Sequence, residues 1–328
     1  MCVVTLEELS KICEQEKNLA MFDSFMIANT KIDTKHRIVC SISGGSDSDI
    51  MLDIVAKLDV QNKAKYIFFD TGVEYEATKR HLDFLENKYD IKIERMKAIT
   101  PVPLGCKKYG VPFWSKHVSE MIKRLQRHKF KWEDRPYDEL IVDYPLCKSA
   151  LKWWCNLHGG NSKFNISYVR GLKEYMIAYP PKFKISPDCC KGGKKNNARK
   201  FLTEYDADLN ILGIRQAEGG IRGAAYKTCY SPAKGSESWD NYRPIFWYTN
   251  QDKAQYERVF NVQHSDCYTK YGLDRTGCAG CPFGKNFEWE LEVCQQYEPK
   301  LYVAINKIFG DAYAYTRGFL KFRDGESL

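Results

Sequence analysis

Two groups of residues have types and spacings that favour chemistry. The first is the run SISGGSDSD at residues 41–49, where two glycines stand among hydroxyl and carboxyl side chains. The second is two cysteine pairs, Cys189 and Cys190 in PDCCKGG and Cys278 and Cys281 in RTGCAGC. Glycine-rich loops that open a helix bind phosphate, and sets of thiols bind soft metals. The sequence therefore predicts an anion site and a thiolate metal site.

The glycine run lies between an apolar segment, RIVCSI at 37–42, and a segment with helical spacing, DIMLDIVAKL at 49–58. Backbone N–H groups and the helix dipole attract phosphate to such a helix entrance. Gly44 and Gly45 would let the backbone approach an anion closely. The Gly-x4-Gly-Lys-Ser/Thr pattern of P-loop NTPases is absent, and the ligand spacing of an EF-hand is absent too. An ordinary turn is the alternative that the local pattern leaves open.

The cysteine pattern leaves several centres open. Iron–sulfur clusters are typically bound by four cysteines. A zinc ion bound by four cysteines is the main rival, although zinc sites prefer pairs separated by two to four residues. Buried thiols without a ligand are a third alternative. Cys229 could replace Cys189 as a ligand, and a cluster held by three cysteines would leave one iron open to carry sulfide.

The elements that must position these residues alternate along the chain. Strand patterns alternate with helix patterns over residues 37–98, which predicts parallel strands joined by crossover helices. The expected fold class is therefore α/β, with a doubly wound, mainly parallel sheet. Ligands of such sheets bind beyond the carboxyl ends of the strands. The glycine loop and the DTG segment at 70–72 both follow strand ends, so we expect them at one site.

Three motifs together resemble the PP-loop ATP pyrophosphatase superfamily. SISGGSDS is similar to its SGGxDS motif, and FFDTG is similar to the DTG motif of its phosphoadenosine phosphosulfate (PAPS) reductase-like branch. GIRQAEGGIR at 213–222 resembles that branch's GxRxxExxxR segment. The CC…CxxC pattern is similar to the iron–sulfur motif of adenylylsulfate (APS) reductases, and the DNA phosphorothioation ATPase is another cluster-bearing relative. The resemblance implies a fold of the adenine nucleotide alpha hydrolase-like type and cleavage of ATP between the α and β phosphates.

The resemblance also implies roles for individual residues. The phosphates of ATP with Mg²⁺ would be bound by Ser43, Gly44, Gly45, Ser46, Asp47 and Ser48. Asp70, Thr71 and Gly72 would lie near the nucleotide, and the expected catalytic residues are Asp47, Ser48 and Asp70. An anionic substrate would meet Arg215, Glu218 and Arg222, because guanidinium groups suit phosphate and sulfate. Surface ion pairing is the alternative role of these arginines. The cysteines 189, 190, 278 and 281 would hold a 4Fe–4S cluster, with Cys229 as the alternative ligand.

The expected parts of the chain follow from these motifs and from composition. Residues 101–185 contain seven prolines and a basic helical stretch, so we expect an insertion there. The five expected parts are an N-terminal helical segment (1–35), a PP-loop nucleotide-binding α/β core (36–100), the basic helical insertion (101–185), the rest of the core with the substrate motif and cluster cysteines (186–285), and a C-terminal helical segment (286–328).

The expected function depends on the absence of a cysteine near the end of this sequence. Sulfonucleotide reductases of this branch attack their substrate with a C-terminal cysteine, and this chain has no cysteine after Cys294. We therefore expect an ATP pyrophosphatase that adenylylates a substrate for sulfur transfer from a donor such as a cysteine desulfurase. A nucleic acid or a nucleobase is the candidate acceptor. An APS or PAPS reductase or binder, with Cys147 or Cys294 as the thiol, is one alternative. A non-enzymatic nucleic-acid-binding subunit with a structural cluster is the other.

Composition limits the partners and the location. The net charge of +8 permits an anionic partner, and the basic stretches at 115–132 and 190–200 are candidates for binding nucleic acid. A solvated helix face or loop explains such stretches as well. Thirteen cysteines without a recognisable secretory signal predict reduced thiols and a cytoplasmic location. The apolar runs are too short to cross a membrane.

Overall fold

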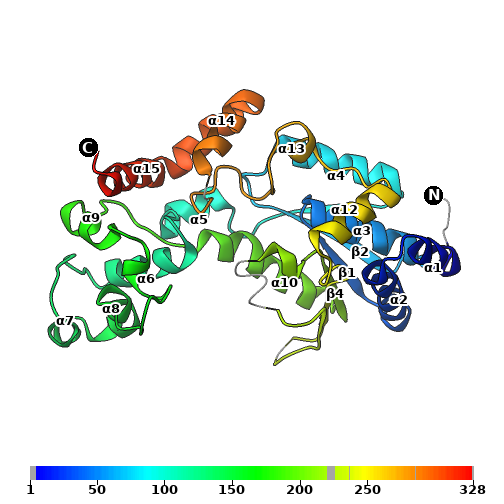
Figure 1. The fold of residues 1–328 in the computed structure, drawn as a ribbon, viewed down its shortest axis with the longest axis horizontal. Coiled ribbons are helices and arrows are strands. Elements are labelled where there is room, and N and C mark those ends of the chain that lie inside the picture. Colours follow the sequence, from blue (N-terminus) through cyan, green and yellow to red (C-terminus); the bar gives the residue numbers. More distant parts are fainter. Residues whose placement is uncertain (1–4, 220–225, 236, 285, 327–328) are drawn as a thin grey trace. The chain divides into compact units, whose positions relative to one another are not determined.

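The computed structural model describes residues 5–219, 226–235, 237–284 and 286–326. Contacts within the chain divide it into two compact units, both drawn in Figure 1. Unit 1 consists of Met1–Ala98 and Lys194–Cys278, and unit 2 consists of Ile99–Gly193 and Ala279–Leu328. The chain leaves unit 1 directly after Cys278, so the boundary falls inside the CxxC pair.

Unit 1 is built on a sheet of six described strands in the order β3-β2-β1-β4-β6-β5. The strands are β1 (Ile38–Ile42), β2 (Ala64–Asp70), β3 (Ile93–Lys97), β4 (Leu209–Leu212), β5 (Tyr230–Ser231) and β6 (Asp240–Tyr242). All neighbouring strands are parallel except β5, which pairs antiparallel with β6. The predicted α/β class with a mainly parallel sheet is confirmed.

Helices cover both faces of this sheet. They are α1 (Leu6–Gln15), α2 (Leu19–Thr34), α3 (Ser46–Leu58), α4 (Glu76–Tyr89), α10 (Asn196–Glu204), α12 (Asn250–Val259) and α13 (Asp266–Thr269). Along β1, Val39 packs with the residues around α10, whereas Ile38 and Cys40 pack with the larger core that contains α2 and α3. This alternation follows from the two-residue period of a strand, and it produces the doubly wound arrangement.

Helix α3 is the central helix of unit 1. It buries 11 of its 13 residues, because apolar side chains surround most of its circumference. Its buried carboxylate Asp53 accepts hydrogen bonds from the hydroxyls of Tyr89 and Tyr256, each at 2.7 Å. A helix fixed on all sides holds its N-terminal turn, which follows the glycine loop, in one position.

Unit 2 consists mainly of helices around an aromatic core. The helices are α5 (Val102–Tyr109), α6 (Lys116–Arg127), α7 (Tyr137–Asp143), α8 (Lys148–Trp154), α9 (Leu172–Ala178), α14 (Phe287–Tyr297) and α15 (Pro299–Asp324). Phe319 of α15 is fully buried in the same cluster as Phe113, Trp153 and Trp154. This packing explains why the last segment of the chain belongs to the same unit as residues 99–193.

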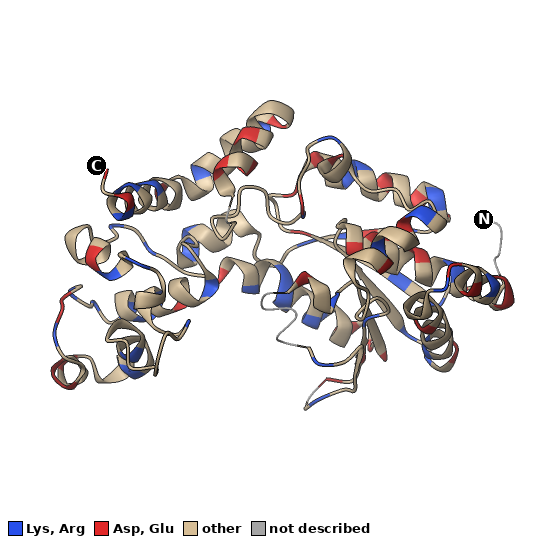
Figure 2. Ribbon diagram, in the orientation of Figure 1, with Lys and Arg blue, Asp and Glu red and all other residues tan. Residues whose placement is uncertain are grey.

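Positive charge is concentrated in unit 2. Its residues 99–193 contain 17 lysines and arginines and 8 aspartates and glutamates, whereas unit 1 contains 27 of each class. Figure 2 shows the basic residues spread along the helices and loops of unit 2 rather than on one helix. Unit 2 is therefore the part of the chain that favours an anionic partner.

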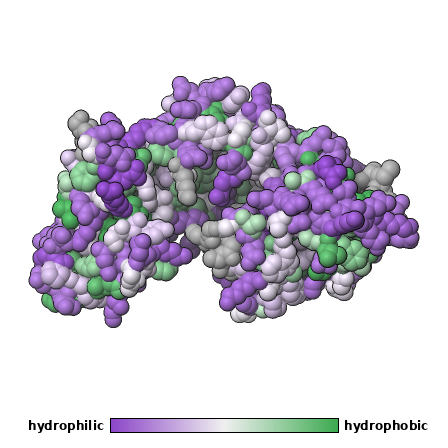
Figure 3. All heavy atoms as spheres, viewed as in Figure 1, coloured by the Kyte–Doolittle hydropathy of each residue, from purple (hydrophilic) through white to green (hydrophobic). Residues whose placement is uncertain are grey.

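The surface drawn in Figure 3 is mostly hydrophilic, with hydrophobic side chains in small separate patches. In the ranges that the structure describes, no helix combines the length and the apolar character needed to cross a membrane.

Candidate functional site

The loop between β1 and α3 lies where the strand order of the sheet reverses, since β2 and β4 flank β1 on opposite sides. Gly44 has a φ of +67°, and a Cβ atom there would lie 2.5 Å from Cγ2 of Thr78, so the loop requires glycine. Gly45 is the N-cap of α3 and has no side chain to bond the first N–H groups of the helix. These N–H groups and the helix dipole suit a phosphate.

Three hydroxyls surround this entrance to α3. A Cβ atom at Gly45 would lie 3.3 Å from each of the side-chain oxygens of Ser43, Tyr268 and Thr276. The backbone N–H groups of Ser46 and Thr276 donate to the Tyr268 hydroxyl at 3.1 and 3.3 Å. Tyr268 and Thr276 were not predicted from the sequence, because no motif marks them and they lie more than 200 residues after the loop.

Ser48 has a structural place in the loop. Its side chain is buried, and its hydroxyl accepts a hydrogen bond of 3.0 Å from the backbone N–H of Ser43. This bond closes the loop over the first turn of α3. On the other side, a Cβ atom at Gly213, which follows β4, would lie 2.7 Å from the carbonyl oxygen of Asp47. The loop is therefore fixed from within and by the neighbouring strand.

Asp47 is the centre of a charged cluster. Arg215 Nε lies 2.8 Å and Lys253 Nζ 2.9 Å from Asp47 Oδ1, and Lys253 also donates to the hydroxyl of Ser46. Burial raises the pKa of Asp47, but hydrogen bonding with Glu218 and the charges of Lys253 and Arg215 outweigh it, so the pKa is lowered. The structure thus brings Asp47, Arg215 and Glu218 together, and it adds Lys253, which the sequence analysis missed.

The predicted DTG segment begins at Asp70, the last residue of β2. The backbone N–H of Gly72 donates to Asp70 Oδ1 at 2.8 Å, so this carboxylate closes a turn. The hydroxyl of the fully buried Thr71 donates to Glu74 at 2.6 Å, and Thr71 Oγ1 lies 3.6 Å from the thiol sulfur of Cys278. Cys278 therefore belongs to the neighbourhood of the DTG turn in unit 1.

A second buried network supports α3 from behind. Asp49 is fully buried, and its Oδ2 lies 2.8 Å from His264 Nδ1 and 3.0 Å from His81 Nε2. His264 Nε2 lies 2.8 Å from Glu257 of α12. Burial disfavours a charged imidazole, but the hydrogen bonds with Asp49 and Glu257 outweigh it and raise the pKa of His264 to about 9. This network joins α3 to α12 and to the segment that carries Tyr268.

Comparison with known families agrees with this geometry. Residues 37–140 match the model of the phosphoadenosine phosphosulfate reductase domain. Over this segment the chain is similar to the PAPS reductase domain. Residues 43–48, whose sequence resembles the PP-loop motif, are called the PP-loop below, and α3 is the helix that follows this loop.

The relatives of this chain include two uncharacterized proteins of Methanocaldococcus jannaschii. One is 28% identical over 118 residues, 36% of this chain and 24% of that protein. The other is 25% identical over 294 residues, 88% of this chain and 52% of that protein. The chain thus spans about half the length of the second relative, and less of the first. A solved PAPS reductase from Candida auris has a TM-score of 0.43 and 12% identity, covering 84% of this chain and 96% of that one.

The predicted cluster cysteines are divided between the two units of the chain. Cys189, Cys190 and Cys281 belong to unit 2, whereas Cys278 and Cys229 belong to unit 1. The carbonyl oxygen of Cys229 accepts a hydrogen bond of 2.8 Å from the N–H of Arg243, next to β5. Among the described side chains, no group of three or more His, Cys, Asp or Glu is arranged to hold a metal ion.

One further cysteine, Cys106 of α5, lies beside Cys189. Hydrogen bonding with Cys106 is the largest cause that raises the pKa of Cys189, and the electrostatic influence of Cys281 adds to it. Cys190 also hydrogen-bonds with Cys189. The donor chemistry of these four thiols fits a soft metal. No role was predicted for Cys106 from the sequence, because no other cysteine lies at motif spacing from it.

Three further residues were candidates from the sequence, namely Arg222, Cys147 and Cys294. Arg222 lies outside the described residues. Cys147 is buried in the aromatic core of unit 2, and its thiol donates to the carbonyl oxygen of Arg124 at 3.6 Å. Burial raises the pKa of Cys147, which disfavours the reactive thiolate form. Cys294 is fully buried as well.

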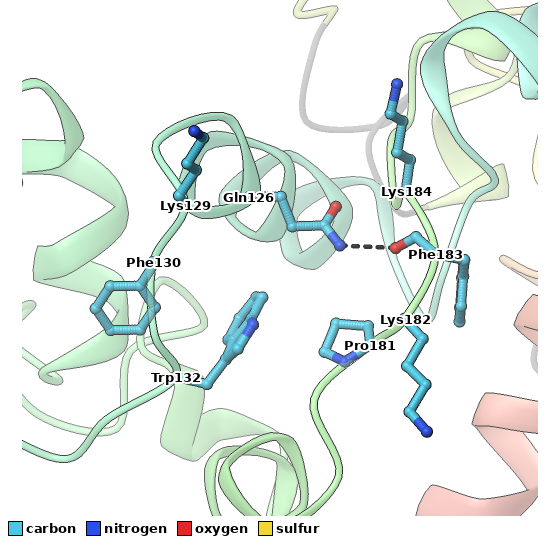
Figure 4. A pocket seen from close by; sticks show the side chains of 8 residues that line it. All are labelled: Gln126, Lys129, Phe130, Trp132, Pro181, Lys182, Phe183 and Lys184. Atoms are coloured by element: carbon cyan, nitrogen blue, oxygen red, sulfur yellow. Dashed lines mark hydrogen bonds between the residues drawn. The ribbon is translucent and has the colours of Figure 1, made fainter.

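Unit 2 also carries a basic groove, drawn in Figure 4. Its volume is about 330 Å³, and its lining residues are Gln126, Lys129, Phe130, Trp132, Pro181, Lys182, Phe183 and Lys184. Gln126 joins the two walls, since its amide donates to the carbonyl of Phe183 at 2.7 Å and accepts from the N–H of Ile185 at 2.9 Å. The exposed lysines and the half-buried ring of Trp132 suit phosphates and bases of a single strand. The predicted basic stretch 115–132 forms one wall.

Proposed function

We propose that this protein is a PP-loop ATP pyrophosphatase that adenylylates a substrate for sulfur transfer. The observation that carries the proposal is the cluster of Lys253 and Arg215 on Asp47 at the entrance to α3. A glycine cradle with backbone N–H donors, an ammonium group and a guanidinium group is equipped to bind the phosphates of ATP.

In the proposed reaction, a substrate oxygen attacks the α phosphorus of ATP and pyrophosphate leaves. The N–H groups of the PP-loop and the ammonium of Lys253 stabilise the negative charge that develops on the departing pyrophosphate. Mg²⁺ bound with the phosphates, with Asp47 and Asp70 as its candidate carboxylates, would neutralise part of the same charge. A sulfur nucleophile then displaces AMP from the adenylylated substrate, and a cysteine desulfurase is one class of donor.

We further propose a nucleic acid or nucleobase as the acceptor. The support is the concentration of positive charge in residues 99–193 and the groove with Lys129, Lys182, Lys184 and Trp132. Lysines bind the phosphates of a strand in a salt-dependent manner, and an aromatic ring stacks on a base. The proposed location is the cytoplasm, where thiols remain reduced.

The proposed metal centre is a 4Fe–4S cluster held by cysteine thiolates, with zinc as the rival ion. The support is the group of thiols around Cys189, which offers soft donors close together. Iron, zinc and acid-labile sulfide analysis of anaerobically purified protein, with an absorbance spectrum, distinguishes a cluster from zinc.

The test of the pyrophosphatase is release of pyrophosphate from ATP by the anaerobically purified protein, alone and with single-stranded DNA, RNA or nucleobases. We expect release that depends on one of these acceptors and that is lost in Asp47→Asn. Absence of release with every acceptor, from protein that still binds ATP, would contradict the proposal. It would favour a nucleic-acid-binding subunit without catalysis.

The second candidate is a sulfonucleotide reductase or binder, favoured by the match of residues 37–140 to a PAPS reductase domain. A thiolate would attack the sulfur of the sulfonucleotide, release the nucleotide and retain an S-sulfonate, from which a second thiol reductant releases sulfite. Cys278, 3.6 Å from Thr71, is the thiol nearest the DTG turn among the described contacts of that turn. Sulfite release from APS or PAPS that requires Cys278 would favour this function over the pyrophosphatase.

A further inference from the structure

Glu257 of α12 lies one helical turn after Lys253, on the same side of the helix. Its Oε1 atom lies 3.7 Å from Lys253 Nζ, which makes an ion pair at i, i+4 spacing. The same oxygen lies 2.8 Å from Nε2 of His264. One carboxylate oxygen of α12 therefore meets both the ammonium group at the PP-loop and an imidazole.

The contacts of Glu257 continue into the core of unit 1. His264 is fixed through its other ring nitrogen, since Nδ1 lies 2.8 Å from Oδ2 of the fully buried Asp49. The same oxygen of Asp49 lies 3.0 Å from Nε2 of His81 in α4. Residues of α3, α4 and the segment before α13 therefore set the position of Glu257.

The charges of this network alternate in sign from the PP-loop inward. Asp47 and Glu257 are carboxylates that both contact the Lys253 ammonium group. The raised pKa of His264, about 9, gives a positive imidazole on the other side of Glu257 at neutral pH. Without the charge of Glu257, the ammonium of Lys253 and the imidazolium of His264 would lie close together with no carboxylate between them.

We propose that Glu257 is a positioning residue of the pyrophosphatase site: it holds the ammonium group of Lys253 in place for the phosphates of ATP, and His264 fixes Glu257 in turn. This inference rests on the proposed function, because it gives Lys253 a partner in the phosphates of ATP. Glu257 acts through Lys253 and does not contact the reacting atoms.

A lysine needs such a partner at a phosphate site, because its four-carbon stem is flexible and its ammonium group has no fixed direction. In the ligand-free protein, Asp47 and the hydroxyl of Ser46 hold this group at the loop. Phosphate oxygens that enter the loop compete with Asp47 for the same ammonium group. Glu257 belongs to the same helix as Lys253, so it restrains the side chain while these partners exchange.

A double-mutant cycle in the full-length protein tests this role. Single-turnover release of pyrophosphate is measured against ATP concentration for the wild type, Glu257→Gln, Lys253→Ala and the double variant. We expect Glu257→Gln to slow release at saturating ATP by about 10-fold without weakening ATP binding, since a group displaced by about 1 Å can cost roughly 100-fold. In the Lys253→Ala background the same substitution should change the rate by less than about 2-fold, because no ammonium group remains to be positioned.

Glu204→Gln is the matched control. Glu204 lies 3.6 Å from Lys200 at the same i, i+4 spacing on α10, where both side chains are exposed. This variant loses the same kind of ion pair and should release pyrophosphate at the wild-type rate. Equal rate losses for Glu257→Gln in the presence and absence of the Lys253 side chain would overturn the proposal, because a purely structural effect does not depend on Lys253. Urea unfolding of each variant measures the stability that is lost.

A second measurement does not depend on ATP turnover. Acetylation of Lys253 in the ligand-free protein is followed by mass spectrometry in the wild type and in Glu257→Gln. We expect the rate to rise about 2- to 5-fold, as for the loss of one partly exposed ion pair, while acetylation of Lys200 stays unchanged. Equal acetylation rates of Lys253 would overturn the proposal. A wild type that releases no pyrophosphate would refute the pyrophosphatase instead, and the acetylation rates would still show whether Glu257 holds Lys253.

Discussion

Lys253 Nζ lies 2.9 Å from Asp47 Oδ1, although 206 positions separate the two residues in the chain. The contact attaches α12 to the first turn of α3 and brings a cation to the PP-loop. Because Lys253 also reaches the hydroxyl of Ser46, its ammonium group is at the place where phosphate oxygens would accumulate charge.

Replacement of Lys253 by alanine should slow pyrophosphate release by roughly 100-fold, since loss of one preorganised donor to a developing charge has effects of this order. Lys253→Arg should retain part of the rate. The matched control is Lys200→Ala, an exposed lysine of α10 that pairs with Glu204. Single-turnover measurements of pyrophosphate give the rates, and equal rates in Lys253→Ala and wild type would remove Lys253 from the mechanism.

The Tyr268 hydroxyl accepts the Ser46 N–H that a phosphate would need. Tyr268→Phe removes this competitor, so we expect pyrophosphate to bind about 2- to 10-fold more tightly, the equivalent of one hydrogen bond. The ligand-free protein should at the same time be less stable by about 1 kcal/mol, because two N–H groups lose their acceptor. Calorimetry and denaturant unfolding measure the two effects. Weaker binding of pyrophosphate would show instead that the hydroxyl contacts the ligand.

The His264 imidazole gives the stability of unit 1 a pH dependence. Its pKa is raised from 6.5 to about 9 in the folded protein, so its contribution is fully present below pH 6.5 and is lost as the pH rises through 9. We expect the stability difference between wild type and His264→Gln to reach on the order of 2–3 kcal/mol near pH 6 and to shrink above pH 9. Urea unfolding at a series of pH values measures it. His36→Gln, at an exposed histidine, is the control, and a difference that grows with pH would contradict the assignment.

Gly44→Ala tests the steric requirement of the PP-loop. The new methyl group would clash with Thr78 Cγ2, and the positive φ adds strain of about 1–2 kcal/mol. We expect lower stability and loss of ATP binding, and Thr78→Ser in the same chain should relieve the clash but not the strain. Gly310→Ala in α15, where a Cβ atom meets nothing within 4 Å, should be neutral or stabilising. Retention of full ATP affinity in Gly44→Ala would argue against a tight cradle.

Combined replacement of Lys129, Lys182 and Lys184 by alanine should weaken single-stranded nucleic acid binding. The magnitude of the slope of log affinity against log salt concentration should decrease by about 2. Each lost phosphate contact on a single strand reduces this magnitude by roughly 0.7. Fluorescence anisotropy at several salt concentrations measures this slope. The control replaces three lysines of α15, Lys300, Lys307 and Lys321, and an equal fall in both variants would mean that the groove has no special role.

The sequence predicted those features that depend on neighbours in the chain. Apolar period and glycine spacing were enough for β1, whose bounds Ile38–Ile42 lie within the predicted apolar segment 37–42, and for the loop that opens α3. The partners of these elements come from distant segments. Lys253, Tyr268 and Cys106 carry no motif, and only the packing of α12, α13 and α5 reveals them. The sequence also could not predict that Cys278 belongs to unit 1, because the two cysteines of one CxxC motif fall in different units.

The order in which the chain is synthesised limits when either unit can fold. The central strand β1 pairs with β4, about 170 residues later, so one edge of β1 stays uncovered until residues 209–212 have been made. The aromatic core of unit 2 likewise stays incomplete until Phe319 of α15 has been synthesised. A ribosome-bound or truncated chain that ends before α15 therefore exposes apolar surface in unit 2, and such intermediates are natural clients for chaperones.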